Sequence, residues 1–110
     1  MSYRIVFGST FRRCVQQLEK RYPHVRDDVK IGIQAIRDNP HLGDVIPNGY
    51  STRKLRVLST DIRKGKRGGY RLIYLVEELP DPRIYLLLLY AKPDKGAVGR
   101  EELRRLIDEL

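Results

Sequence analysis

The sequence has little of what secreted, membrane-spanning or disulfide-stabilised proteins need. Its single cysteine, Cys14, has no second thiol in the chain to pair with, which favours a reducing compartment. The longest apolar run, Ile84 to Ala91, has the length of a strand and falls far short of the roughly 20 residues that span a bilayer. The first residues include no apolar stretch behind a basic start, so we expect no signal peptide. A cytoplasmic protein without a membrane partner is the expectation.

The common hydrolytic centres are missing as well. Neither His24 nor His41 has a cysteine or acidic residue at the spacing of a metal-ligand set, so we expect no metal site and no cofactor. Both histidines lie in or beside a predicted helix, far along the chain from the basic residues, and we interpret them as surface residues. The glycine-rich stretch 65–69 does not lead from a strand into a helix, so it is no nucleotide-binding loop. Cys14 falls on the apolar side of a predicted helix, which indicates a buried, unreactive thiol.

Positive charge is in excess, and it is concentrated in one part of the sequence. The chain of 110 residues carries a net charge of +8. Eight basic residues and one acidic residue, Asp61, give the segment 53–71 a charge of +7 and leave +1 for the rest. Such a concentration favours a polyanionic partner, although a solvated basic loop would have the same composition. The eight basic residues are Arg53, Lys54, Arg56, Arg63, Lys64, Lys66, Arg67 and Arg71.

Hydrophobic periodicity predicts a single α+β domain over residues 1–110. The order is β-α-α-β-β-β-α. The predicted elements are a strand over 3–7, two amphipathic helices that end at Asn39, strands over 54–58, 70–76 and 84–92, and a helix from about residue 100. The links between the last three strands are too short for a crossover, so we expect an antiparallel sheet. The two consecutive helices form a hairpin that covers one face of it.

Strand geometry brings basic and aromatic residues of this sheet together. Side chains two residues apart leave the same face of a strand, so Lys54 and Arg56 share a face, as do Tyr90 and Lys92. Arg71 opens the strand between these two. With the helices on the opposite face, the five side chains converge on one basic surface. Basic residues on the solvent face of a strand are ordinary, but this number on one face favours an anion site.

Four short motifs follow one another between residues 39 and 92. They are NPHLGDVI at 39–46, RKLRV at 53–57, GKRGGYRLIY at 65–74 and LLYAK at 88–92. In this order and spacing they resemble the RelE superfamily of toxin–antitoxin toxins, most closely its HigB branch. The resemblance implies a RelE-like (microbial-ribonuclease-like) fold, and the predicted order of elements agrees with it over the whole chain.

The resemblance also implies an activity, namely ribosome-dependent cleavage of messenger RNA without a metal. In such cleavage a ribose 2′-hydroxyl attacks the adjacent phosphodiester. Arg67 and Arg71 suit the charge of the phosphate, and Lys54 is the candidate base because nearby cations favour its neutral form. Tyr90 could stack on a base, orient the nucleophile or donate a proton. Matching by position gives a catalytic set of Lys54, Arg56, Arg67, Arg71, Tyr90 and Lys92, and an RNA-binding set of Arg53, Arg63, Lys64 and Lys66.

A toxin of this kind implies a cognate antitoxin encoded nearby, and we expect the toxin to be monomeric when free. The final helix has an apolar stripe of Leu103, Leu106, Ile107 and Leu110, which could contact that partner or pack on its own domain; the second is favoured. Two other functions stay open. Relatives of the ParE type share the fold but inhibit DNA gyrase, and a non-catalytic RNA-binding module would have the same basic surface.

Overall fold

The structure is a computed structural model that describes residues 3–62 and 68–110. The predicted order of one strand, two helices, three strands and one helix is confirmed, with the short elements β2 and η1 as additions. β2 has only two residues and lies in a stretch rich in glycine, proline and asparagine, so no hydrophobic pattern predicts it. The elements are β1 Arg4–Phe7, α1 Ser9–Glu19, α2 Val25–Asp38, β2 Asp44–Val45, β3 Thr52–Val57, β4 Tyr70–Glu77, β5 Arg83–Ala91, the 3₁₀ helix η1 Lys92–Asp94 and α3 Arg100–Asp108.

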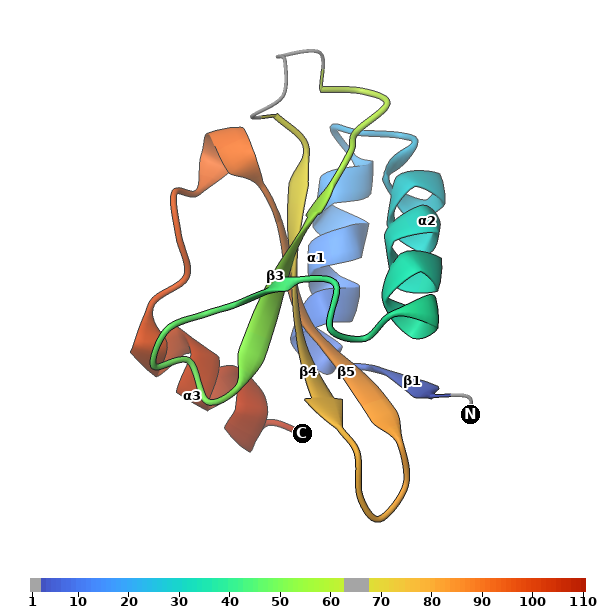
Figure 1. Ribbon diagram of the computed structural model, residues 1–110. Coiled ribbons are helices and arrows are strands. Elements are labelled where there is room, and N and C mark those ends of the chain that lie inside the picture. Colours follow the sequence, from blue (N-terminus) through green and yellow to red (C-terminus); the bar gives the residue numbers. More distant parts are fainter. Residues whose placement is uncertain (1–2, 63–67) are drawn as a thin grey trace.

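The strands form one five-stranded sheet in the order β1-β5-β4-β3-β2 (Figure 1). β3, β4 and β5 form the predicted antiparallel meander. The expectation of a wholly antiparallel sheet is wrong, because β1 pairs with β5 in parallel, with Arg4 opposite Arg83 and Phe7 opposite Leu86. β1 and β5 are far apart in sequence, and α1 and α2 carry the chain from one edge of the sheet to the other. No hairpin therefore determines the direction of β1.

α1 and α2 lie side by side on one face of the sheet, which we call the helical face (Figure 1). Phe11 of α1 and Val29 and Ile36 of α2 are buried against strand residues such as Leu72 and Tyr74. Each helix has one apolar stripe, and burying both stripes against the sheet forms the larger part of the core. The predicted helical hairpin over one face is confirmed.

α3 packs on the opposite face, which we call the α3 face. Leu103 and Leu106 are 1% and 6% exposed and lie in one cluster with Ile73, Leu87 and Leu88. The apolar stripe of α3 is thus largely satisfied within its own chain, which is the favoured of the two expectations. Because both faces of β5 are covered, its run of apolar residues has no polar side.

β5 contains one residue more than its partner strand. Ile73 of β4 lies opposite Leu88, and Tyr74 lies opposite Leu86, so Leu87 has no counterpart in the ladder. Leu87 and Leu88 consequently both join the cluster on the α3 face. Alternation then resumes, which turns Tyr90 to the α3 face. Without this bulge the same alternation would direct Tyr90 to the helical face.

Side chains of α2 hold the chain where it leaves β3. The carboxylate of Asp28 accepts hydrogen bonds from the backbone nitrogen of Thr60 at 2.8 Å and from its Oγ1 at 2.6 Å. The backbone nitrogen of His24 donates to Oδ2 of Asp61 at 2.9 Å. These bonds attach residues 60–61, at the root of the basic connection, to the first turn of α2. Asp28 is buried, and a buried carboxylate needs such partners.

Candidate nucleic-acid interface

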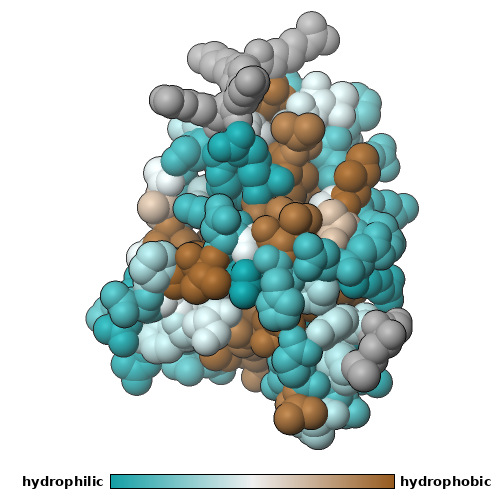
Figure 2. All heavy atoms as spheres, in the orientation of Figure 1, coloured by the Kyte–Doolittle hydropathy of each residue, from teal (hydrophilic) through white to brown (hydrophobic). Residues whose placement is uncertain are grey.

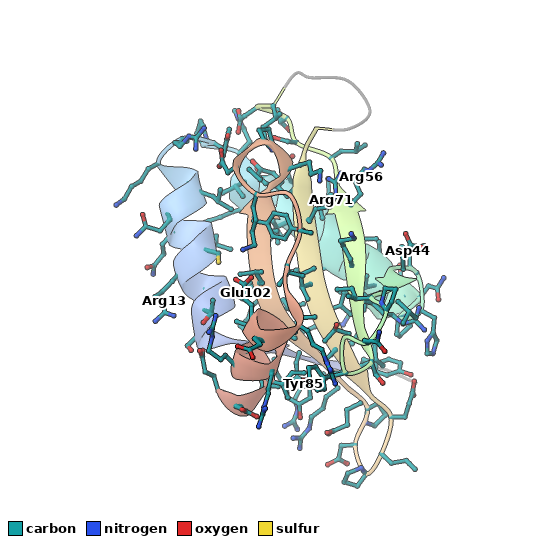
Figure 3. The ribbon with its side chains drawn as sticks, turned by 90° about the vertical axis from the view of Figure 1, so that its left-hand side faces the viewer. Arg13, Asp44, Arg56, Arg71, Tyr85 and Glu102 are labelled. Atoms are coloured by element: carbon teal, nitrogen blue, oxygen red, sulfur yellow. The ribbon has the colours of Figure 1, made fainter. Side chains whose placement is uncertain are left out.

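Three of the predicted residues form a row across neighbouring strands. Arg56 of β3 lies directly opposite Arg71 of β4, and Arg71 lies directly opposite Tyr90 of β5. Leu55 and Val57 pack in the core on the helical face, so alternation directs Arg56 to the α3 face. Figure 3 shows Arg56 and Arg71 next to each other over β3 and β4. The structure thus brings these three residues together, as predicted.

Arg71 is the buried cation of this row. Its side chain is 8% exposed, and Nη1 donates hydrogen bonds to the carbonyl oxygens of Tyr70 at 3.2 Å and Gly68 at 3.4 Å. Burial lowers the pKa of Arg71, and the nearby charge of Arg56 lowers it further. A guanidinium keeps its proton at neutral pH despite such a shift. The row therefore contains a positioned positive charge that is poorly hydrated, which suits the binding of an anion.

Tyr90 is the buried phenol of the row, with 7% of the residue exposed. Burial is the main cause that raises the pKa of Tyr90, while the charges of Arg71 and Lys95 act in the opposite direction. The phenol consequently holds its proton throughout the neutral pH range. A protonated phenol can act as a donor of a hydrogen bond or of a proton, and Tyr90 lies directly opposite Arg71 in the sheet.

The other predicted lysines lie at different positions. Lys54 leaves the same face of β3 as Arg56, two residues earlier, and is opposite Ile73. Lys92 follows β5 in η1, and its Nζ donates to the carbonyl oxygen of Gly96 at 2.8 Å. Lys54 thus borders the row, whereas the ammonium of Lys92 is bound within its own turn.

Arg53 is placed apart from the other predicted residues. Its neighbours in β3 alternate, so Arg53 leaves the helical face and not the α3 face. Its Nη1 donates to the carbonyl oxygens of Gly43 at 2.8 Å and His41 at 3.1 Å. These bonds hold the loop after α2 against the sheet. The predictions for Arg63, Lys64, Lys66 and Arg67 fall on residues 63–67, outside the described residues.

Two charged residues beside Tyr90 are absent from the predicted set. Nζ of Lys95 lies 2.9 Å from Oε1 of Glu102, and both groups act electrostatically on the phenol of Tyr90. Glu102 is in the first turn of α3, where a carboxylate is favourable for the helix dipole alone. A pair that joins a turn to a helix leaves no periodic signal in the sequence, so only the folded arrangement identifies it.

The histidines are situated away from the row, whereas Cys14 lines a surface pocket together with Tyr90. Nδ1 of His24 lies 2.8 Å from Oδ1 of Asp61, and Nε2 of His41 lies 3.5 Å from Oε1 of Glu78. Cys14 is partly exposed and packs beside both cores, and burial is the main cause that raises the pKa of its thiol. Within residues 3–62 and 68–110, no three His, Cys, Asp or Glu side chains are grouped so that they could hold a metal ion.

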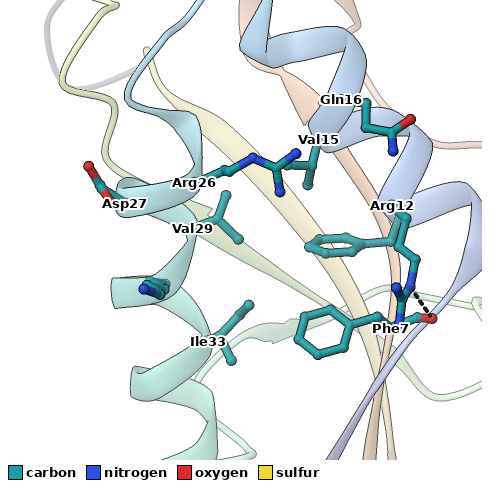
Figure 4. A pocket seen from close by; sticks show the side chains of 10 residues that line it. Phe7, Arg12, Val15, Gln16, Arg26, Asp27, Val29 and Ile33 are labelled. Carbon is teal, nitrogen blue, oxygen red and sulfur yellow. Dashed lines mark hydrogen bonds between the residues drawn. The ribbon is translucent and has the colours of Figure 1, made fainter.

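A cavity of about 550 Å³ lies between α1 and α2, on the side of the molecule away from the row (Figure 4). Phe7, Phe11, Val15, Val29 and Ile33 supply its apolar lining. The polar residues that line it are Arg12, Gln16, Arg26, Asp27 and Lys30, of which three are basic and one is acidic. Nothing in the sequence predicted this cavity, because it depends on how two amphipathic helices diverge.

The surface beside β3 is mainly hydrophilic, and its apolar side chains lie in separate patches (Figure 2). Among the helices that the structure describes, none is both long enough and apolar enough to cross a membrane.

Comparison with known proteins identifies the fold. No protein-family model matches the sequence. The chain is similar to a solved structure of the E. coli toxin RelE, a double arginine-to-alanine mutant in the free state, with a TM-score of 0.56 and 18% sequence identity. The match covers 99% of this chain and 94% of the RelE chain. At this identity the similarity establishes architecture and not chemistry, and it does not bear on the HigB branch. The chain therefore has the RelE fold.

Proposed function

We propose that this chain is the toxin of a toxin–antitoxin system and that it cleaves messenger RNA on the ribosome. The observation that carries the proposal is the row of Arg56, Arg71 and Tyr90, with Lys54 beside it. Two forked cations beside a buried phenol suit a phosphodiester. The fold supports the proposal, because the E. coli protein that shares it is a toxin. On the motifs between residues 39 and 92 we assign the chain to the HigB branch.

The proposed reaction is an attack of the ribose 2′-oxygen on the adjacent phosphorus. A new 2′-oxygen–phosphorus bond forms, and the bond to the 5′-oxygen breaks, which leaves a cyclic phosphate and a 5′-hydroxyl. Lys54 accepts the proton of the 2′-hydroxyl, and Tyr90 donates its phenolic proton to the departing 5′-oxygen. Arg56 and Arg71 stabilise the negative charge that builds on the phosphate oxygens. Arg67 has this role as well in the proposed set, and Lys92 contributes charge at the end of β5.

The proposed catalytic residues include no strong general base, and this explains why the enzyme would depend on the ribosome. A lysine is a poorer base at neutral pH than a histidine, and the two histidines lie in pairs with Asp61 and Glu78. The enzyme therefore depends on a substrate whose 2′-hydroxyl is already aligned with the phosphorus. In the proposal, the ribosome supplies that alignment by holding the messenger RNA in place. The basic segment, including Arg63, Lys64 and Lys66, would then contact the surrounding RNA.

We propose that the toxin is monomeric when free and is neutralised by an antitoxin from the adjacent gene. The cavity between α1 and α2 offers such a partner an apolar floor, and its predominantly basic rim favours an acidic amphipathic segment. Phe7 lines the cavity and is 43% exposed, so Phe7→Asp should prevent copurification of the neighbouring gene product. Ile31→Asp is the matched control, because Ile31 is 72% exposed on α2 and does not line the cavity.

A translation system made from purified components tests the cleavage proposal. We expect the wild-type protein to produce new RNA ends only when ribosomes translate the message. Arg71→Met should abolish these ends in a folded protein, whereas Lys30→Met removes a cation from α2 and should leave them unchanged. Zinc-selective chelation should also leave them unchanged, because the described residues lack a ligand group for a metal.

The same preparations discriminate between the proposed function and its two rivals. Intact RNA together with arrested supercoiling by DNA gyrase would replace the proposal with a gyrase inhibitor of the ParE type. RNA that is bound but never cut, on or off ribosomes, would leave a non-catalytic binding module.

A further inference from the structure

The chain folds back on itself directly after Tyr90. The backbone nitrogen of Lys92 donates to the carbonyl oxygen of Gly69 at 2.9 Å, which continues the pairing of β5 with β4. η1 then turns the chain, and the backbone nitrogen of Lys95 donates to the carbonyl oxygen of Lys92 at 3.4 Å. Residues 96–99 lead from this turn into α3. Two lysines, Lys92 and Lys95, therefore lie in or beside the turn that follows Tyr90.

The two lysines have different partners. Lys92 donates its ammonium to the carbonyl oxygen of Gly96, within the same turn. Lys95 forms an ion pair of 2.9 Å with Glu102 in the first turn of α3. The side chains of Lys95 and Glu102 are 35% and 29% exposed, so water reaches the pair but does not surround it. Leu103, the residue after Glu102, is 1% exposed and fixes this turn of α3 against the sheet.

The two members of the Lys95–Glu102 pair have opposite effects on the pKa of Tyr90. Lys95, like Arg71, lowers the pKa of Tyr90, whereas Glu102 raises it. Tyr90 also packs in one apolar cluster with Leu103, the residue after Glu102. Among the described residues, Arg71 thus lies opposite Tyr90 in the sheet, and Lys95 follows it in the turn, where Glu102 of α3 holds the ammonium.

We propose that Lys95 is a positioning residue of the cleavage site, held by Glu102, which offsets the negative charge left on Tyr90 after its proton moves to the 5′-oxygen. The proposal rests on the proposed function. In the step concerned, the phosphorus–5′-oxygen bond breaks with its electron pair on the oxygen, and the phenolic proton goes to that oxygen. The phenolate that remains is almost inaccessible to water, so nearby cations must take over the role of hydration. After the product leaves, the phenolate takes up a proton from solvent, and Lys54 releases to solvent the proton that it took from the 2′-hydroxyl.

The charge on Tyr90 can be measured without RNA. A fluorinated tyrosine at position 90 makes the phenol more acidic, and its fluorine resonance reports the titration in the folded protein. We expect Lys95→Met to raise the pKa of this phenol and Glu102→Gln to lower it. Lys30→Met makes the same change of charge on α2, away from the row, and should not move it. A pair that only holds the turn in place would shift the pKa in the same direction for both variants, or not at all, and either result overturns the proposal.

Cleavage on ribosomes provides the second readout. Lys95→Met should slow single-turnover cleavage about tenfold or more, and Lys95→Arg, which keeps the charge, should recover most of the rate. An equal loss in Lys95→Met and Lys95→Arg, with the fold intact, would contradict a role based on charge. If the wild-type protein does not cleave RNA at all, the proposed function fails, while the titration still decides whether Lys95 and Glu102 control the phenol.

Discussion

Arg56 and Arg71 lie directly opposite each other across β3 and β4, so two guanidinium-bearing side chains leave the α3 face from neighbouring strands. Like charges in directly opposite positions destabilise a sheet. The repulsion between the two guanidinium groups is one contribution among the contacts that both residues make. An anion bound across the row would be attracted by both groups.

Replacing one member of this pair should stabilise the free protein. We expect Arg56→Gln to raise the free energy of unfolding by about 0.5 kcal/mol at low salt and by less at high salt, because the repulsion is removed or screened. Urea unfolding at two salt concentrations measures this. Lys30→Gln makes the same charge change on α2 and should show a smaller effect. A destabilised Arg56→Gln protein would show that other contacts of Arg56 outweigh the repulsion.

Tyr90 should act through its hydroxyl. We expect Tyr90→Phe to slow cleavage about 100-fold without loss of the fold, because a general acid contributes at least that much. The pKa of Tyr90 is raised above 10.0, so the wild-type rate should show no loss from its deprotonation between about pH 6 and about pH 9. Tyr85→Phe is the control, since Tyr85 lies on β5 and its hydroxyl donates to Glu77 at 3.3 Å. Equal losses in both variants would contradict a specific role for Tyr90.

The ion pair of His24 and Asp61 should make stability depend on pH. The bond to Asp61 is the main cause that raises the pKa of His24 above 6.5, and the bond to His24 is the main cause that lowers the pKa of Asp61 below 3.8. The raised pKa contributes stability that is complete below 6.5 and is lost as the pH rises through the folded value. The lowered pKa contributes stability above 3.8 that is lost as the pH falls through its folded value.

His24→Gln should therefore lower the melting temperature most near pH 5 and progressively less in alkaline solution. Thermal unfolding across this pH range tests the expectation. His41→Gln should have a weaker effect, because His41 and Glu78 form a longer and more exposed pair. Neither variant should change cleavage on ribosomes. Loss of cleavage in a folded His24→Gln protein would mean that the proposed catalytic site is misplaced.

The apolar stripe of α3 should contribute to stability at one end only. Leu103 is 1% exposed, so Leu103→Ala should cost about 2–5 kcal/mol of unfolding free energy. Leu110 is 49% exposed, and Leu110→Ala should change that free energy by about 0.5 kcal/mol or less. Chemical denaturation of the two variants makes the comparison. Similar values for both would mean that α3 is not fixed on the sheet in solution.

Local patterns predicted most of the fold and the position of several basic residues on one face of the sheet. Alternation in β3 correctly placed Lys54 and Arg56 on one face, since that strand is regular. The direction of β1 could not be predicted, because its four residues do not encode a partner. Arg53 is grouped with the other basic residues because the predicted strand begins only at Lys54; β3 in fact includes Arg53, and alternation directs it to the helical face. The pair of Lys95 and Glu102 is formed by a turn, and turns have no periodicity to reveal it.

Because of the extra residue at Leu87, the face from which Tyr90 leaves β5 depends on the number of residues in the strand as well as on their types. Insertion of one further leucine between the bulge and Tyr90 would leave the composition of the run nearly unchanged, yet Tyr90 would then leave the helical face. Such an insertion should thus be far more damaging than substitution of one aliphatic residue for another. For chains that share this fold at low identity, equivalent positions at the end of β5 are best counted from the bulge. An alignment counted from the start of β5 would instead match Tyr90 with a residue that is buried on the helical face.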